Sequence, residues 1–522
     1  MVKSRTVLPQ LLPLFMLLLV GCTTLGPDYE EPQIAWLDSW QPDLYGQLGH
    51  PTQQANSDLR FWWHLFDDQR LNQLIATAKK NNPSLHIAGL RILESRAALN
   101  IAGSSRRPQL QQINGALSAI NTDQSGGGSN NTSDDFFAYQ SEFRVGWELD
   151  FWGRFQRGIE SADAVFLASV TAQQDLQVLL SAQVTQLYFA YSTLAKRIDV
   201  AQTNAARQKR SYALTQKLFE AGQGSELDLQ QAKTQYLSTQ ASVPQLQAGL
   251  TQIRNALCAL LGLPPGELAL LTARSSSLPA YETVHLPDIP AQLLLRRPDI
   301  RTAAWRVAAQ SAQIGVAKAD YYPAISLSGQ LGWSGNSLNS TANTSQLSAG
   351  PSFTWNIFDY GRVDNNVRLQ DARLQQSIEA FRNRVLIAAK EIDDAAISLA
   401  KYGEQQEILK QAIVSAERSL DLANIRYREG YANFQRVLDA QRSLLTQTDR
   451  YLVTQGAHLN AVAALYKAFG GGWSDMPPDT WLPANIRTQM QKRTDWSDWL
   501  EQAPSTSPRS GAKTNTIPVS PP

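Results

Sequence analysis

An internal duplication is the feature that most restricts how this chain of 522 residues can fold. The segment Asn82-Pro83-Ser84-Leu85 has a counterpart in Arg297-Pro298-Asp299-Ile300, 215 residues further on. Downstream, Gly222 corresponds to Gly430 with a spacing of 208, so a length difference of 7 residues lies between these points. A period of about 210 residues is far longer than a solenoid repeat. The sequence therefore predicts two structural halves with the same order of elements.

Each half contains a very long run without helix-breaking residues. No proline or glycine occurs between Gly158 and Gly222, and only Gly403 interrupts the run between Gly361 and Gly430. Both runs are rich in Ala, Leu, Gln, Arg and Glu, which favour helix. At 1.5 Å per residue each helix would be about 95–100 Å long, too long for burial in one globule. Such helices belong to a coiled coil or a helical barrel.

The predicted fold is mainly α-helical with a β part, and its boundaries follow the repeat. Glycines at the ends of the long runs predict that each long helix reverses into a returning helix. Pro244 predicts a bend in the first returning helix. The first repeat is expected at 67–287, with helices at about 84–104, 153–221 and 225–262, and the second at 288–474, with helices at about 299–319, 361–429 and 432–470.

Two segments in each half alternate between apolar and polar residues. They lie at about 110–122, 136–151, 324–335 and 347–358. Alternation gives a strand one apolar and one polar face. Strands of roughly ten residues with aromatic residues near their ends suit a transmembrane β-barrel. Alternation alone also fits a soluble hairpin with one buried face.

Four strands cannot form a closed barrel by themselves. In a bilayer they would leave two edges with unpaired backbone groups, which cost several kcal/mol each. Known barrels of this kind start at about eight strands. Several chains therefore have to contribute strands, and the same symmetry would close a ring of long helices below them. The copy number stays open, because two chains give eight strands and three give twelve.

The first residues predict a lipoprotein. Lys3 and Arg5 precede an apolar stretch over residues 11–20, which is too short to span a bilayer and predicts a signal peptide at 1–21. The residues before Cys22 resemble a bacterial lipobox, so we expect cleavage before Cys22 and lipidation of its thiol. The alternative is an ordinary secretory signal with an incidental cysteine. Residues 22–66 are expected to form an extended segment laid over the body.

Composition and motifs argue against an enzyme and against a nucleic-acid-binding protein. The 47 basic and 46 acidic residues leave a net charge of +1 and no global field that would attract a polyanion. The five histidines are scattered and the two cysteines lie far apart in the sequence, so neither residue type has the spacing of metal ligands. We therefore expect neither a metal site nor a cofactor. No phosphate-binding loop and no nucleophile elbow occur. Cys258 is expected to be a buried, inert thiol, and residues 475–522 to be largely disordered.

Several segments match a known protein family. They are Gly26-Pro27-Asp28-Tyr29-Glu30-Glu31-Pro32, Leu295-Arg296-Arg297-Pro298-Asp299-Ile300-Arg301, Ile314-Gly315-Val316-Ala317-Lys318-Ala319 and Val437-Leu438-Asp439-Ala440-Gln441-Arg442. On these segments, from about residue 22 to 474, the chain resembles TolC-superfamily outer-membrane factors. The resemblance is to the lipoprotein branch that serves resistance-nodulation-division pumps. Within the match, Arg296 and Arg297 can bind an anion, or they can hold together by hydrogen bonds the mixed equatorial belt that the resemblance implies around the helices. Tethering is the favoured interpretation.

The resemblance implies the exit duct of a tripartite efflux pump in the outer membrane. It implies a homotrimer with a twelve-stranded β-barrel, to which each chain gives four strands, and a long α-helical hairpin barrel through the periplasm. Its partners would be a periplasmic adaptor protein and an inner-membrane transporter of the resistance-nodulation-division class. Export through the duct would be passive and need no cofactor. The pump is expected to select the cargo, so drugs, phenolic acids and metals all stay open.

The resemblance also implies a gate at the helix-turn-helix tips. Members of the family narrow the pore there with two aspartates three residues apart. The second position falls on Asp439, but the first falls on Arg436, and Asp228 is the equivalent of Arg436 in the first repeat. We expect Arg436 to pair with Asp439, or with Asp228 as a closing latch. The alternative is that all three are solvated helix residues of little energetic value.

Two other functional classes compete with the duct. A long coiled-coil scaffold lipoprotein would explain the helices, but it does not need the alternating segments with Trp333 and Trp355. A secreted hydrolase would need a catalytic constellation, and the sequence shows none.

Overall fold

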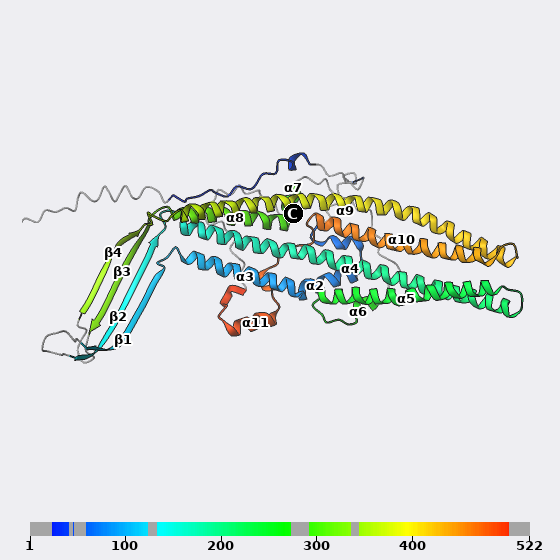
Figure 1. Cartoon of the computed structure of the whole chain (residues 1–522), viewed down its shortest axis with the longest axis horizontal. Coiled ribbons are helices and arrows are strands. Elements are labelled where there is room, and N and C mark those ends of the chain that lie inside the picture. Colours follow the sequence, from blue (N-terminus) through cyan, green and yellow to red (C-terminus); the bar gives the residue numbers. More distant parts are fainter. Residues whose placement is uncertain are drawn as a thin grey trace, which may run out of the picture.

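The computed structural model describes residues 23–40, 45, 59–123, 133–272, 292–335 and 344–500. A β-sheet lies at one end of the long axis and the turns of two helical hairpins lie at the other (Figure 1). The long helices between them follow that axis, which makes the molecule elongated. No helix in these ranges combines the length and the apolarity that a membrane span requires.

The two halves of the chain contain equivalent helices of equal length. The shorter pair has 22 residues each, the long pair 67 each, which is about 100 Å, and the returning pair 35 each. In the same order they are α3 (Pro83–Ser104) and α8 (Pro298–Ala319), α4 (Arg154–Glu220) and α9 (Arg362–Arg428), and α5 (Glu226–Leu260) and α10 (Phe434–Ala468). Shorter elements are α2 (Gln69–Asn81), α6 (Ala269–Thr272), α7 (Gln292–Arg296), α11 (Ala484–Arg493) and 3-10 helices at Leu37–Ser39, Leu59–Phe66, Pro478–Thr480 and Ser497–Leu500.

Equivalent glycines bound the long helices and the returning helices in both halves. Their φ angles lie between 69° and 81°, a left-handed conformation that favours glycine. The pairs, 208 residues apart, are Gly153 and Gly361 before the long helices, Gly222 and Gly430 in the hairpin turns, and Gly262 and Gly470 after the returning helices. The duplication visible in the sequence therefore extends to the backbone conformation of the turns.

The strands form one antiparallel sheet in the order β1-β2-β3-β4. β1 (Leu110–Asp123) and β2 (Ser133–Leu149) come from the first half, and β3 (Ala324–Gly335) and β4 (Thr344–Thr354) from the second. β2 and β3 join the halves, with pairs from Tyr139↔Gly335 to Leu149↔Ile325. β4 ends at Thr354 rather than near 358, because its partner β3 begins at Ala324, just after Pro323.

The two faces of the sheet differ in polarity. Large apolar side chains point to one face, where Ile113, Leu347 and Phe353 are 77%, 78% and 74% exposed. The other face carries Asn, Gln, Ser and Gly, as at Asn114 and Gln330, together with a few charged residues. β1 and β4 are both edge strands of the single chain. One chain thus exposes an apolar surface and two unpaired edges together.

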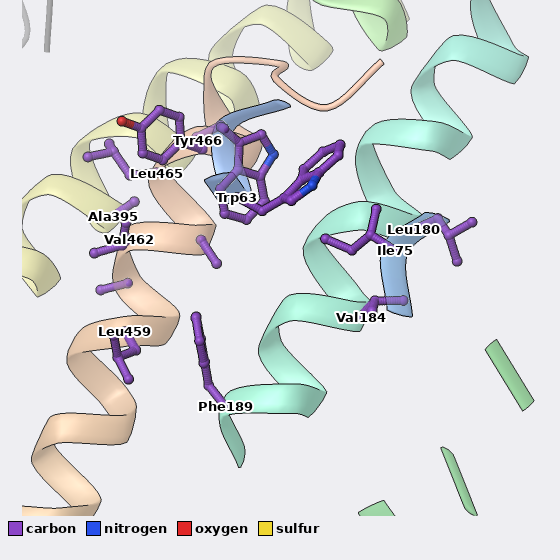
Figure 2. Packing of buried hydrophobic residues seen from close by; sticks show 14 of the residues in the cluster. Trp63, Ile75, Leu180, Val184, Phe189, Ala395, Leu459, Val462, Leu465 and Tyr466 are labelled. Atoms are coloured by element: carbon purple, nitrogen blue, oxygen red, sulfur yellow. The ribbon is translucent and has the colours of Figure 1, made fainter. Parts of the chain in front are cut away.

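The main core lies midway along α4 and α9, and Figure 2 shows part of it from close by. Trp63 of the 3-10 helix Leu59–Phe66 lies between α4 and α10 (Figure 2), and Trp62 and Phe66 belong to the same buried cluster. The Trp62 ring stacks on Tyr466 at 5.4 Å, and Phe66 meets Phe189 edge-on at 4.7 Å. Each such buried aromatic side chain contributes about 1.5–3 kcal/mol. The N-terminal segment is therefore part of the core as well as a surface strap.

The prediction of a largely disordered tail after residue 475 is wrong for residues 475–500. Trp481, Leu482, Met490 and Leu500 are buried in a second cluster together with Ile92, Leu93 and Phe166. The overall Pro, Ser and Thr content concealed these spaced apolar residues, which cover the outer side of α3 and α4. Residues 501–522 lie outside the described residues.

Candidate functional site

The hairpin turns at the far end from the sheet meet in a small apolar cluster. α4 joins α5 through residues 221–225, and α9 joins α10 through residues 429–433 (Figure 1). Phe434, Val437 and Leu438 of α10 pack against Ala232 of α5. A groove of about 500 Å³ opens beside this cluster between α4, α9 and α10. The two hairpins of one chain therefore pack together next to their turns.

The three expected gate residues lie in this region. Arg436 and Asp439 are exposed, and Asp228 is half-buried. Asp439 accepts a hydrogen bond from Gln435 at 3.0 Å and lies 3.6 Å from Arg442. Among the described residues of the single chain, Arg436 forms no ion pair with Asp439 or Asp228. A latch through Arg436 would thus have to form between chains.

Asp228 has a different local environment. It lies in the first turn of α5, where the free backbone amides favour a carboxylate. Burial, followed by the nearby charge of Asp228, raises the pKa of the Tyr427 phenol. Tyr427 also packs on the apolar cluster, so Asp228 is electrostatically coupled to the second hairpin.

Polar contacts that the sequence did not reveal connect the two hairpins above the turns. Arg197 of α4 binds Asp449 of α10 through two bonds of 2.7 and 3.1 Å. Closer to the turns, Gln441 donates to the Ser211 hydroxyl at 3.2 Å, and Arg442 donates to Gln235 at 3.3 Å. Residues so far apart in sequence give no local pattern, and only the repeat suggested that the hairpins are neighbours.

Equivalent joints in the two halves connect a returning helix to the shorter helix that continues its line. In the first half, the Asn82 amide donates to the Leu260 carbonyl at the end of α5 at 2.8 Å. In the second half, Arg297 donates to the Ala468 carbonyl at the end of α10 at 2.7 Å. Both side chains satisfy a carbonyl that has no partner inside its own helix.

The second joint is charged and the first is neutral. Arg297 binds both carboxylate oxygens of Asp299, at 3.1 and 2.9 Å, and Glu391 at 2.7 Å, while Arg384 lies 2.7 Å from Asp299. Burial alone would lower the pKa of Arg297, but the bonds to Asp299 and Glu391 raise it overall. Burial would likewise raise the pKa of Asp299, and the two arginines lower it. These bonds confirm the tethering interpretation, because Arg297 ties the start of α8 to the end of α10 and to α9.

Asp175 of α4 lies near this charged group but, among the described residues, forms no ion pair with it. Burial is the main cause that raises the pKa of Asp175 to about 6, and repulsion from Asp299 adds to it. The positive charges of Arg384, Arg297 and Lys467 offset part of the rise. The joint therefore contains a carboxylate that changes its charge near neutral pH.

The N-terminal segment is fixed at the sheet end of the helices. Arg157 of α4 donates to the carbonyls of Leu25 and Gly26, at 3.0 and 3.3 Å, and to the Asp28 carboxylate at 2.7 Å. A Cβ on Gly153 would lie 2.8 Å from the Thr24 backbone. Residues 23–28 thus lie next to the start of α4, at the end of the helices that adjoins the sheet. Cys22 and the predicted signal peptide lie outside the described residues.

Metal and thiol chemistry have little support in this region. In the parts of the chain that the structure describes, no group of three or more His, Cys, Asp and Glu side chains could hold a metal ion. Cys258 is buried, as expected, with its sulfur 3.7 Å from the Gly266 carbonyl.

Comparisons with known proteins agree with this architecture. The family model described as outer membrane efflux protein matches residues 74–263 and 289–471. The chain is 31% identical to the cation efflux system protein CusC of Escherichia coli O6:H1, over 89% of this chain and 99% of that protein. It is 30% identical to the solvent efflux pump outer membrane protein SrpC of Pseudomonas putida, over 89% and 98%. Its structure is similar to that of the outer-membrane channel OprN, with a TM-score of 0.75 and 32% identity over 86% of this chain and 99% of the other.

Proposed function

The chain belongs to the outer membrane efflux protein family, and we propose that three copies of it form one continuous duct. As a member of this family it is the outer-membrane exit channel of an efflux pump. The proposed assembly is a homotrimer in which twelve strands close a β-barrel and the helical hairpins close a tunnel through the periplasm.

One observation carries the trimer proposal. A single chain exposes an apolar sheet face and two strand edges, and unpaired edges in a bilayer cost several kcal/mol each. Pairing β1 of one chain with β4 of the next removes both edges. Three chains then give twelve strands around a polar interior, which is wide enough for a water-filled passage.

The position of the N-terminal segment supports a lipid anchor on Cys22. Thr24 packs against Gly153 at the base of the sheet, and Cys22 precedes it by two residues. A lipid on the Cys22 thiol would therefore start close to the membrane boundary. Mass spectrometry of the mature protein would show an acylated N-terminal peptide. A free thiol at residue 22 would contradict this part of the proposal.

The gate remains a proposal that involves Asp228, Arg436 and Asp439. Because Arg436 and Asp439 are exposed near the turns, symmetry would bring their copies together around the pore axis. We expect Arg436→Ala combined with Asp439→Ala to raise the conductance of the channel in planar bilayers. The exposed Arg450→Ala, higher on α10, is the matched control. Unchanged closure in the double variant would eliminate the latch.

Membership of the family indicates the classes of partner and of cargo, but not the individual molecules. The chain acts in a tripartite system, and we propose a periplasmic adaptor and an inner-membrane transporter of the resistance-nodulation-division class as its partners. Similar proteins are named for cation efflux and for solvent efflux at nearly the same identity. The duct therefore carries small molecules that its pump selects.

The deciding experiment is the particle mass of the detergent-extracted, lipidated protein, measured by light scattering with the detergent subtracted. A mass of three chains is the expected result. A folded monomer would overturn the composite duct and favour a coiled-coil scaffold. A dimer would give only eight strands, whose interior the side chains fill, and would therefore also overturn the composite duct.

A further inference from the structure

A buried carboxylate lies in the middle of the sheet. Glu142 of β2 is only 4% exposed although the sheet is a single layer. Its Oε1 atom lies 2.8 Å from Arg144 Nε in an ion pair and accepts a hydrogen bond from Asn114 Nδ2 of β1 at 3.2 Å, and its Oε2 accepts from Gln330 Nε2 of β3 at 3.0 Å. One carboxylate thus ties together three strands, including the seam between the two halves of the chain.

This cluster lies on the polar face of the sheet. Register pairs Asn114 with Glu142, and Arg144 with Gln330, while Phe143 between them points to the apolar face. If the apolar face meets lipid, Glu142 and its partners face the lumen. The inference in this section rests on that proposed barrel.

Glu142 and Arg144 are the main charged residues of the polar face. Among strand residues whose side chains the structure describes, the only other charge on the polar face is Glu148, at the helical end, 3.8 Å from Arg154. The neighbours of the pair on the same face, including Gln112, Gln346 and Ser348, are uncharged. The middle of the lumen therefore takes its electrostatic character from Glu142 and Arg144.

The two charges are not equally accessible. The Glu142 side chain is 5% exposed, whereas the Arg144 side chain is 46% exposed. A buried carboxylate is costly unless it is paired and hydrogen-bonded, and here the ion pair with Arg144 and two amide donors satisfy it. The carboxylate is therefore covered by its partners, and the guanidinium is the part of the pair that a passing solute meets.

We propose that Arg144 is a specificity-determining residue of the duct, which offers a positive contact to anionic groups such as carboxylates and sulfonates in the middle of the barrel. Glu142 is its positioning residue. It holds the guanidinium in place by the ion pair with Nε and compensates its charge, so that anionic solutes are favoured without being trapped.

The test measures the potential inside the barrel, and the state of the periplasmic gate does not affect it. Ser348→Cys places a reporter thiol on the polar face, on the strand beyond Gln330, which pairs with Arg144. At about 4.8 Å per strand it lies about 10 Å from Arg144. The rates of its reaction with an anionic sulfonate and a cationic trimethylammonium thiosulfonate reagent, added from outside at low salt, report the local charge.

Each single variant should change the ratio of the anionic to the cationic rate in a set direction. Arg144→Gln in the reporter background should lower it about fourfold, because removal of one charge at that distance changes each rate about twofold in opposite directions. Glu142→Gln, which keeps the shape of the side chain, should raise it by a similar factor. The double variant should return to the original ratio, which loss of structure would not do.

The outcomes separate this inference from the proposed function. If both single variants leave the ratio unchanged while Ser348→Cys reacts, the pair does not act on the lumen and the inference is wrong. If Ser348→Cys reacts with neither reagent and Leu347→Cys on the apolar face does, the polar face lines no passage. That result would overturn the composite duct itself. Arg144→Gln leaves Asn114 and Gln330 bonded to Glu142, so it serves if Glu142→Gln does not fold.

Discussion

At the residue scale, the functional chemistry of this channel depends on how individual charges are paired. The sequence indicated Arg297 as a hydrogen-bonding tether and Cys258 as a buried thiol, and the structure confirms the bonds of the one and the burial of the other. The partners of Arg297 could not be predicted from the sequence, because Glu391, for example, lies 94 positions away. Glu142 shows the same limit, since its three partners come from three strands and only the register of the sheet brings them together.

Asp175 gives a pH-dependent prediction. Its pKa is raised to about 6, so the folded chain holds the proton more tightly than the unfolded chain does. Stability from this group is therefore intact below its ordinary pKa near 4, falls as the pH rises to about 6, and stays reduced above that value. Asp175→Asn should stabilise the protein by about 1–2 kcal/mol at pH 8, after allowance for partial solvent screening.

The measurement is the unfolding temperature of the detergent-solubilised variant and the natural protein between pH 4 and pH 8. Their difference should grow through this window and be small at pH 4. Asp199→Asn, at an exposed position on the same helix, serves as the control. A stabilisation independent of pH would mean that the charge of Asp175 is not the cause.

At the element scale, duplication explains why so much of the fold was visible in the sequence. Proline- and glycine-free runs indicated the long helices, and period-two alternation indicated the strands, because both patterns are local. The sequence did not predict α2 or the second hydrophobic cluster, which the C-terminal segment forms. Short helices have weak sequence patterns and depend on packing. The two halves also differ at their joints, where Asn82 stands in one and Arg297 in the other.

The two joints should differ in their sensitivity to mutation. Asn82→Ala removes one cap and should cost about 1–2 kcal/mol. Arg297→Gln leaves Asp299 buried without its main partner and should cost about 3–5 kcal/mol. Adding Asp299→Asn to Arg297→Gln should recover part of the loss. Thermal unfolding of the four proteins, including the natural one, checks this order, and equal losses at both joints would refute it.

Two turn glycines with the same backbone conformation should also respond differently. Gly222 and Gly262 have φ angles of 70° and 69°. Nothing would lie within 4 Å of a Cβ on Gly222, but a Cβ on Gly262 would lie 2.4 Å from the Asn81 carbonyl oxygen. Gly222→Ala should therefore cost only the backbone strain of about 1–2 kcal/mol, and Gly262→Ala clearly more. Similar unfolding temperatures for both variants would show that the Asn81 backbone moves aside freely.

At the scale of the whole molecule, segments from both ends of the described chain cover the helices between sheet and hairpin turns. Residues 23–28 are clamped by Arg157, and the 3-10 helix Leu59–Phe66 enters the main core. The residues after Gly472 return over α3 and α4, where Gln174 donates to Asp475 at 2.8 Å. These segments fix the part of the duct that would lie between the barrel and the hairpin turns. Composition alone assigned both to the periphery, because it averages a few apolar anchors over long polar stretches.

The C-terminal segment should therefore be needed for a stable chain. Truncation after Gly472 would expose Ile92, Leu93 and Phe166, and the loss of burial should lower stability by several kcal/mol and reduce the yield of folded protein. Truncation after Leu500 should have little effect, because that variant keeps every described contact of the segment. Trp481→Ala in the full chain separates packing from length. Trp481 is 6% exposed and lies 3.0 Å from where a Cβ on Gly89 would be, so its removal should cost about 3–5 kcal/mol. Equal unfolding temperatures for the two truncated forms would show that the cluster contributes nothing to the body, and the helices alone would then determine the stability of the duct.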